Sequence, residues 1–301
     1  MDPSLIGLSN AGLFVAAALV AVGFWEHAVP ERPASMPAGP RWIANFALYG
    51  LSTLLAAGLG LLLGDAAGTL LPRLPFDGDA LGPLAHAAIV ILAMDLAHYW
   101  LHRLLHAQLW RVHAVHHTDP DPDVSTAVRH HPAEIIPTTA LTVFVGGLFG
   151  ATAGELAAYG VLAFAVQALA HANVALPRSI AGAMQAVVVT PGFHRVHHSR
   201  DERECHANYG QVFTIWDRLF GTAIAPSRAA PVAYGVDGFL APRFQRVGTI
   251  LMQPVLPPDR PATEAATRAE PPGRVAPARR GASSSRSAAL RHPGRRRAQR
   301  R

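Results

Sequence analysis

Few residues of this 301-residue chain are charged: Asp, Glu, Lys and Arg together make up 15%, while 50% of the residues are hydrophobic. None of the 26 basic residues is a lysine, and Cys205 is the only cysteine. A lone cysteine excludes an intrachain disulfide and a thiolate metal cage. So little polar surface also argues against a water-soluble protein, because it could not cover the apolar residues. The sequence therefore predicts an integral membrane protein.

Long uncharged runs mark the expected membrane helices. Residues 5–24 and 42–64 have the length of about 20 residues that crosses a bilayer. A third run begins near residue 84 and ends before Asp95, and residues 135–177 are expected to form a helical hairpin. The first run lacks the basic start and the cleavage site of a secretory signal, so we expect it to be retained. The expected fold is all-α, with about four transmembrane or re-entrant helices.

The arginine positions predict how these helices are oriented, because basic residues gather on the cytoplasmic side of a membrane. Arg32 and Arg41 follow the first run, and Arg103, Arg111 and Arg129 follow the third. The hairpin returns the chain to the side from which it started. We therefore expect a bacterial inner-membrane protein with its N-terminus outside and its histidine-rich segments in the cytoplasm.

Composition divides the chain into four segments. Residues 1–83 hold the first two runs, residues 84–222 hold most of the histidines, and residues 223–256 form an extension. Residues 257–301 are rich in Pro, Arg, Ala and Ser, which predicts a disordered tail. This tail is basic but has no aromatic residue on which bases could stack, so no nucleic-acid partner is expected.

Eleven of the 16 histidines fall into three clusters, and His171 stands between the second and the third. The clusters are His98, His102 and His106; His113, His116, His117, His130 and His131; and His194, His197 and His198. Spacings of three and four residues place imidazoles on one face of a helix. Neutral imidazole is a common ligand of iron, zinc and copper. So many histidines, with no cysteine among them, predict a site for more than one metal ion.

The order of these residues resembles that of the membrane-bound fatty acid hydroxylase and sterol desaturase superfamily. The resemblance covers roughly residues 84–222. Its matching residues are Asp95, Tyr99, Trp100, His102, Arg103 and His106; Leu109, Trp110, Arg111, His113, His116 and His117; Arg129, His131 and Pro132; His171 and Asn173; Pro191, His194, His197 and His198; Asn208, Tyr209 and Gly210; and the run 216–222. The first two apolar runs carry no diagnostic motif of this superfamily.

The resemblance implies a cytoplasmic, histidine-rich cap that holds two iron ions. Such a centre would use O2 to hydroxylate or desaturate a membrane lipid. Its electrons would come from NAD(P)H through a partner protein such as a reductase, a ferredoxin or a cytochrome. The implied ligands are His102, His106, His113, His116, His117, His171, His194, His197 and His198, with His131 as a further ligand or an outer support.

Four more residues are expected to support the ligands: Asp95, Arg129, Asn173 and Asp217. Asp95 lies seven residues before His102 on the same helix face, where it could accept a hydrogen bond from a ligating histidine. The remaining histidines near the clusters receive other roles. We expect His98 and His130 to be structural and His206 to be solvated.

Two other functions stay open at this point, a zinc-dependent membrane hydrolase and a metal transporter. A hydrolase needs a carboxylate general base near its zinc, but the sequence has no HExxH motif, and Glu134 and Glu155 are the only acids of the hairpin region. A transporter would carry polar ligands at mid-membrane depth, whereas these histidines gather at predicted helix ends. No GxGxxG motif follows a strand, so the chain itself is not expected to bind the pyridine nucleotide.

Overall fold

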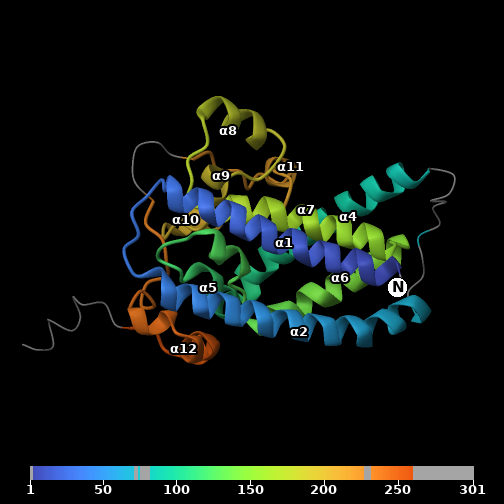
Figure 1. The fold of residues 1–301 in the computed structure, drawn as a ribbon, viewed down its shortest axis with the longest axis horizontal. Coiled ribbons are helices and arrows are strands. Elements are labelled where there is room, and N and C mark those ends of the chain that lie inside the picture. The colour runs from blue at the N-terminus through green and yellow to red at the C-terminus, as the bar shows by residue number, and fades with distance from the viewer. Residues whose placement is uncertain (1–2, 71–73, 75–81, 227–231, 260–301) are drawn as a thin grey trace, which may run out of the picture. The chain divides into compact units, whose positions relative to one another are not determined.

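The computed structural model describes residues 3–70, 74, 82–226 and 232–259. These residues form helices, and their only β-pairing consists of two isolated bridges. The long helices are α1 (Pro3–Ala28), α2 (Ala38–Leu70), α4 (Pro83–Gln108), α6 (Ile135–Phe149) and α7 (Ala153–His171). They lie alongside one another in Figure 1, where α1 contacts α7 and α6 contacts both α2 and α4. The predicted all-α fold is confirmed.

The short helices gather at one end of the long ones (Figure 1). They are α5 (Trp110–His117), η1 (Val124–Val128), η2 (Pro132–Glu134), α8 (Arg178–Gln185), α9 (Pro191–His197), α10 (Glu202–Cys205), α11 (Ile215–Leu219), η3 (Pro242–Gln245), α12 (Val247–Met252) and η4 (Gln253–Val255). This end of the protein is the cap. Its short helices after Arg178 agree with the mixed, amphipathic sequence of that region.

Four helical stretches are long and apolar enough to cross a membrane, as the sequence predicted. They are Ala38–Gly64, Pro83–Gln108, Pro132–Phe149 and Ala153–His171. Most of each stretch is not buried within the chain; Leu54 and Leu61, for example, are 75% and 80% exposed. Such large apolar side chains are stable on a surface that faces lipid. α1 is also apolar, but its described side chains, Gly12–Ala28, form a shorter stretch.

The hairpin of α6 and α7 turns at a left-handed residue. Gly150 ends α6 with φ 65°, a conformation that costs a glycine little. Thr152 then starts α7 through a capping box with Glu155, which satisfies backbone N–H groups at the helix start. Met94 of α4 and Tyr159 of α7 pack with Val145 of α6 in the main apolar core. This hairpin returns the chain to the cap, as predicted.

The segment after residue 232 packs back onto the cap. Ile250 of α12 joins Ala44 and Leu48 of α2 and Val115 of α5 in a second core cluster. Residues 232–256, most of the predicted extension, therefore cover α5 rather than extending away from it. The predicted disordered tail, from residue 260 on, lies outside the described residues.

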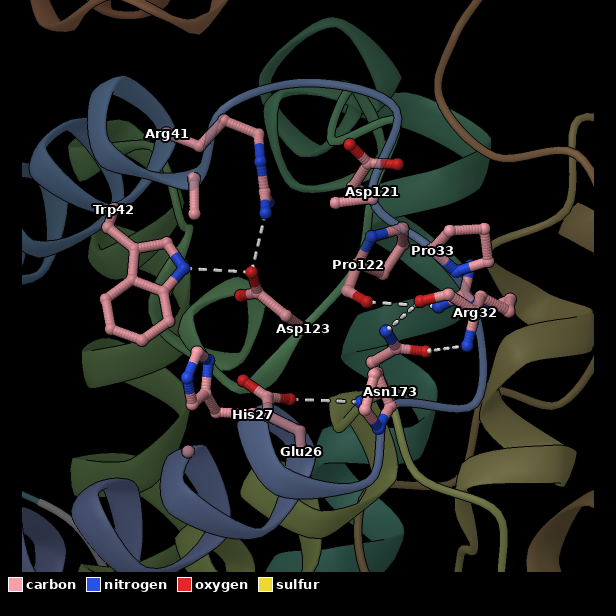
Figure 2. A pocket seen from close by; sticks show the side chains of 14 residues that line it. Glu26, His27, Arg32, Pro33, Arg41, Trp42, Asp121, Pro122, Asp123 and Asn173 are labelled. Carbon is pink, nitrogen blue, oxygen red and sulfur yellow. Dashed lines mark hydrogen bonds and ion pairs between the residues drawn. The ribbon is translucent and has the colours of Figure 1, made fainter.

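Buried ion pairs fasten the start of α2 to the cap. Arg41 donates from one terminal nitrogen to Asp119, at 2.7 Å, and from the other to Asp123, at 2.6 Å. Trp42 donates its indole N–H to the same Asp123 (Figure 2). A buried arginine of this kind is stable only with its partners in place. Arg41, Trp42 and Asp123 line a cavity of about 320 Å³ between the start of α2, the end of α1 and the loop before η1.

Candidate metal centre

Nine buried histidines converge in two groups in the cap. Each imidazole contributes one ring nitrogen to its group, and within a group these nitrogens all lie within 4.8 Å of one another. The five-histidine group comprises His102, His106, His113, His117 and His197. The four-histidine group comprises His116, His171, His194 and His198. All nine belong to the set that the sequence predicted, and none is more than 9% exposed.

Two short helices divide their histidines between the groups in opposite ways. In α5, the outer pair of the HxxHH motif, His113 and His117, joins the five-histidine group, and His116 joins the four-histidine group. In α9 and its C-cap, the outer pair joins the four-histidine group, and His197 joins the other. Residues one turn apart share a helix face, whereas adjacent residues point about 100° apart. One motif can therefore serve two sites at once.

The inner nitrogens of the four-histidine group lie close together. His171 Nε2 is 3.0 Å from His194 Nε2 and 3.1 Å from both His198 Nε2 and His116 Nε2, and the Nε2 atoms of His194 and His198 are also 3.1 Å apart. A single proton can join only two imidazoles, so hydrogen bonds cannot satisfy three nitrogens that contact each other mutually. Nitrogens bound to one ion at about 2.1 Å, with about 90° between the bonds, lie about 3.0 Å apart. The group therefore fits a metal ion.

The five-histidine group shows the same feature. His113 Nε2 lies 3.1 Å from His102 Nε2 and 3.3 Å from His117 Nε2. Both ring nitrogens of His106 and the Nε2 atom of His197 are buried with no hydrogen-bond partner among the described residues. Leaving a buried polar atom unpaired costs about 1–3 kcal/mol. A bound cation would satisfy these nitrogens, so this group also fits a metal ion.

Backbone carbonyls hold the outer nitrogens of four histidines. The Nδ1 atoms of His102, His197, His171 and His116 lie 2.9, 2.7, 2.8 and 3.3 Å from the carbonyl oxygens of residues 209, 207, 167 and 129. A carbonyl oxygen can only accept a hydrogen bond, so Nδ1 carries the proton in each case. The lone pair is then on Nε2, which points into the group. This arrangement prepares each ring as a ligand.

Burial keeps these imidazoles neutral. Five histidines of α5, α9 and the α9 C-cap have a pKa well below the usual value, mainly because they are removed from water and also because other histidines lie close by. They are His116, His117, His194, His197 and His198. A neutral imidazole has a free lone pair, and the protonated form has none. The cap therefore presents its histidines in the form that binds metal ions.

Residues 87–222 match the model of the fatty acid hydroxylase family. Over this segment the chain is similar to the fatty acid hydroxylase family. The family resemblance that the sequence suggested is thereby confirmed.

The chain is also similar to curated enzymes whose names describe lipid modification. Ornithine lipid hydroxylase OlsE of Rhizobium tropici is 32% identical over 165 residues, which are 54% of this chain and 49% of that protein. Alkylglycerol monooxygenase of Homo sapiens is 30% identical over 151 residues, 48% of this chain and 32% of that protein. The Danio rerio alkylglycerol monooxygenase is 30% identical over 153 residues. The chain thus spans about half the length of the first relative and about a third of the human one. No solved structure matches the chain.

His131 does not join the nine histidines. Its Nε2 atom lies 3.1 Å from the carbonyl oxygen of Leu251, and its Nδ1 atom accepts the backbone N–H of Ala133 at 3.1 Å. Both ring nitrogens are therefore engaged outside the groups, and its inclusion among the expected ligands is corrected. His131 instead caps η2 and holds the segment of α12 against the domain.

Asp95 is buried as a support, but its partners differ from the expected one. Its carboxylate accepts hydrogen bonds from the backbone N–H groups of Val212 and Phe213, at 2.9 and 3.0 Å, and from the indole of Trp216 at 2.8 Å. No bond from any of the nine histidines to Asp95 occurs in the described residues. The expectation that Asp95 orients a histidine directly is therefore wrong. Asp95 instead anchors the segment that follows Tyr209. The carbonyl oxygen of Tyr209 accepts a hydrogen bond from His102 Nδ1.

The side chains of the other three expected supports also make no hydrogen bond to the nine histidines in the described residues. Arg129 is fully buried, donates to the Val115 carbonyl and joins η1 to α5, and its own carbonyl lies against His116. Asp217 accepts the backbone N–H groups of Tyr209 and Gly210 at 2.7 and 2.8 Å.

Asn173 binds the loop between α1 and α2. It exchanges hydrogen bonds with the backbone of Arg32, and its own N–H donates to Glu26 (Figure 2). It follows His171 by two residues, so it fixes the end of α7 that carries this histidine. None of the four supports contacts an inner nitrogen of the groups.

Glu134 is a support that the sequence did not single out. One carboxylate oxygen lies 3.1 Å from His113 Nδ1 and the other 2.9 Å from His130 Nδ1. A carboxylate behind a histidine fixes its tautomer and strengthens it as a ligand. The ring of His130 in turn stacks on His116, with 4.6 Å between the centroids. The four-residue spacing of His130 and Glu134 could have predicted their contact.

The other histidines outside the groups lie where the sequence predicted. His98 contacts the Met94 carbonyl at 2.8 Å and Thr142 at 3.4 Å, both in the long helices. His206 is exposed. His98 and His130 both line a cavity of about 260 Å³ that borders both groups.

Proposed function

We propose that this protein is a di-iron, O2-dependent lipid hydroxylase. The reaction would convert a C–H bond to C–OH, consuming O2, two electrons and two protons and releasing one water. Iron in the two groups would supply the redox chemistry that activates O2. The catalytic segment would be residues 84–222, with residues 1–83 as its membrane support.

The observation that carries this proposal is the pair of buried histidine groups at the end of four apolar helices. Histidines alone would hold both ions. Lipid chains partition into the bilayer, so a centre at the helix ends can meet them there. Both kinds of relative named above carry lipid hydroxylase or monooxygenase in their names.

The protein's own groups would perform three tasks. The inner Nε2 atoms would hold the ions, and the backbone carbonyls and Glu134 would keep their ring orientations fixed. Burial of all nine histidines would keep bulk water away from the reacting carbon. The cavity that borders both groups would receive the substrate. Nothing in this arrangement requires a side chain to act as a general acid or base.

The orientation and the electron supply complete the proposal. The basic loops support an orientation in which the cap would lie in the cytoplasm of a bacterial cell and the long helices in the inner membrane. Electrons from NAD(P)H would arrive through a separate reductase, ferredoxin or cytochrome. Desaturation of the same lipid would need the same oxidant and electrons and would release two waters. Hydroxylation is favoured because both kinds of relative are hydroxylases or monooxygenases by name.

The two other functions fit the site less well. A hydrolase needs a free carboxylate that faces a metal-bound water, but both oxygens of Glu134 are engaged by His113 and His130. A transporter needs ligands spaced along a path through the membrane. Here the nine histidines gather at one end of α4 and α7 and in short helices beyond them.

Metal analysis with product analysis tests the proposal. Protein purified in detergent from iron-supplemented cells should hold about two irons per chain, and the double variant His116→Ala, His197→Ala should hold none. With a reductase system and O2, membrane lipids should gain one oxygen atom, detected by mass spectrometry with ¹⁸O2. Stable, folded protein that takes up no iron, or iron-loaded protein that oxidises no lipid, would refute the function.

A further inference from the structure

The cavity beside the histidine groups also borders three membrane helices. Its wall contains His102 and His113 of one group and His116 and His194 of the other. The rest of the wall comes mainly from α4, α6 and α7, whose apolar contributions include Leu101, Leu105, Ile135, Ala163 and Phe164. The cavity therefore connects both candidate ion positions with the part of the protein that would face the bilayer.

Among the α7 residues in the cavity wall, Gly160 lies farthest along the helix from His171. Gln167, also in the wall, lies one turn before His171. The seven residues from Gln167 to Gly160 span about 10 Å of helix. Gly160 is exposed, and a Cβ atom added there would have no described heavy atom within 4 Å. It lies near the middle of the apolar stretch Ala153–His171.

The size of the cavity limits what it can hold. Its volume is about 260 Å³, less than the roughly 300–1,000 Å³ of pockets that enclose whole drug-sized ligands. A lipid as a whole does not fit, but one segment of an unbranched chain does. A fused-ring lipid would present a rigid body that the same space cannot enclose.

We infer that the cavity binds the headgroup-proximal segment of an unbranched lipid chain, and that the tail leaves through the gap at Gly160 into the bilayer core. This inference rests on the proposed function and names its substrate class. Gly160 is then the specificity-determining residue for chain length. Because it has no side chain, the far end of the cavity stays open and long tails are accepted. A larger residue closes the end, so only chains that stop before it fit.

Photolabelling tests this inference without turnover. The iron-loaded protein in detergent is labelled with palmitic acid that carries a diazirine near the middle of its chain, where the chain would pass Gly160, and unlabelled palmitic acid competes for the site. Labelling that palmitic acid displaces should map to the cavity end of α7 in the wild-type protein. In Gly160→Leu it should fall by roughly tenfold or more, the effect expected when a pocket loses room for one or more methylene groups.

A chain-length series makes the test sharper. Decanoic acid should compete equally well in wild type and Gly160→Leu, whereas palmitic and stearic acids should lose competition only in the variant. Gly160→Ala should lie between them, because its single methyl group enters open space in a helix that favours alanine. Ala158→Leu, an exposed position on the same helix outside the cavity wall, is the matched control and should behave as wild type.

The outcomes separate the two proposals. No displaceable label in the wild type, or a label that does not decrease as residue 160 grows from Ala to Leu, overturns the inference. Retained iron content in each variant shows that it is folded, and if Gly160→Leu lacks iron, Gly160→Ala alone decides through its long-chain competition. Size-dependent labelling without any oxygenated lipid would leave the cavity inference standing and reject the proposed function.

Discussion

The Nε2 atoms of His116 and His171 lie 3.1 Å apart, although 55 residues separate them in the chain. His116 belongs to α5 of the cap, and His171 is the last residue of α7, a helix long and apolar enough to cross a membrane. The four-histidine group thus joins the cap to a membrane helix directly. Relative movement between them would separate its ligands.

Removal of one histidine should distinguish the two groups. We expect His171→Ala to lose about one of two irons, because its group keeps three histidines with altered geometry while the five-histidine group is intact. Lipid oxidation should fall by more than about 100-fold, beyond the effect typical of an outer-support mutation. Iron per chain, measured by plasma mass spectrometry, checks this prediction. His27→Ala, at an exposed position outside the histidine groups, is the control, and equal iron content in both variants would contradict the assignment.

Glu134→Gln should weaken metal binding without removing a ligand. A glutamine oxygen can accept from one of the two rings that Glu134 now serves, but its NH2 group cannot accept from the other. The iron dissociation constant should rise about 10–100-fold. Competition with a chelator measures the change. Glu155→Gln, at the far end of the hairpin, should keep wild-type affinity, and an equal loss in both would show a general effect on folding.

Asp95→Asn should destabilise the domain. The carboxylate accepts from Val212, Phe213 and Trp216, and an asparagine NH2 would face at least one of these donors. We expect a loss of about 1–3 kcal/mol in the free energy of unfolding, seen as a lower melting temperature in detergent. Asp237→Asn, whose side chain is 80% exposed, should melt like wild type. A stable Asp95→Asn protein would show that these bonds do not hold the segment.

The metal-free protein should lose stability as the pH falls below about 6.5, the usual histidine pKa. Folding lowers the pKa of His116, His117, His194, His197 and His198. Below pH 6.5 the unfolded chain takes up protons that the folded chain does not, so unfolding is favoured by up to about 1.4 kcal/mol per pH unit for each histidine. Chemical unfolding of chelator-treated protein between pH 5 and 8 tests this. A flat profile would contradict the burial of neutral histidines.

Cys205 should resist alkylation in the folded protein. Burial raises the pKa of its thiol to about 12, and only the thiolate reacts quickly. Iodoacetamide at pH 8 should therefore leave Cys205 unmodified until denaturant is added, as intact-mass measurement would show. Rapid labelling of the native protein would mean that the cap opens around α10.

The sequence predicted the membrane helices and the clustered histidines because both depend on local patterns, whereas His171 entered the expected set through the superfamily resemblance. Long apolar runs need lipid, and the HxxHH spacing puts two imidazoles on one helix face. The division into groups was not predictable, because it depends on how α5 and α9 face each other. The spacing alone does not show that His116 belongs to the group of His171, whereas His113 and His117 of the same helix belong to the other group.

The two corrections have the same origin. Asp95 does share a helix face with His102, but the backbone N–H groups of Val212 and Phe213 donate to its carboxylate instead. His131 matches the superfamily pattern, yet the carbonyl of Leu251, from a segment outside that pattern, occupies its ring nitrogen. Contacts between segments more than 100 residues apart decided both residues, and such contacts leave no local sign in the sequence.

The position of α9 also sets an order of events during synthesis. His197 belongs to one group, and His194 and His198 belong to the other, so neither group is complete before the ribosome has reached residue 197. By then α2, α4, α6 and α7 have all been made, and the apolar parts of a membrane protein enter the bilayer as they emerge. Iron would then be loaded after the helices have been inserted. A nascent chain stopped before α9 would display several histidines but would complete neither group.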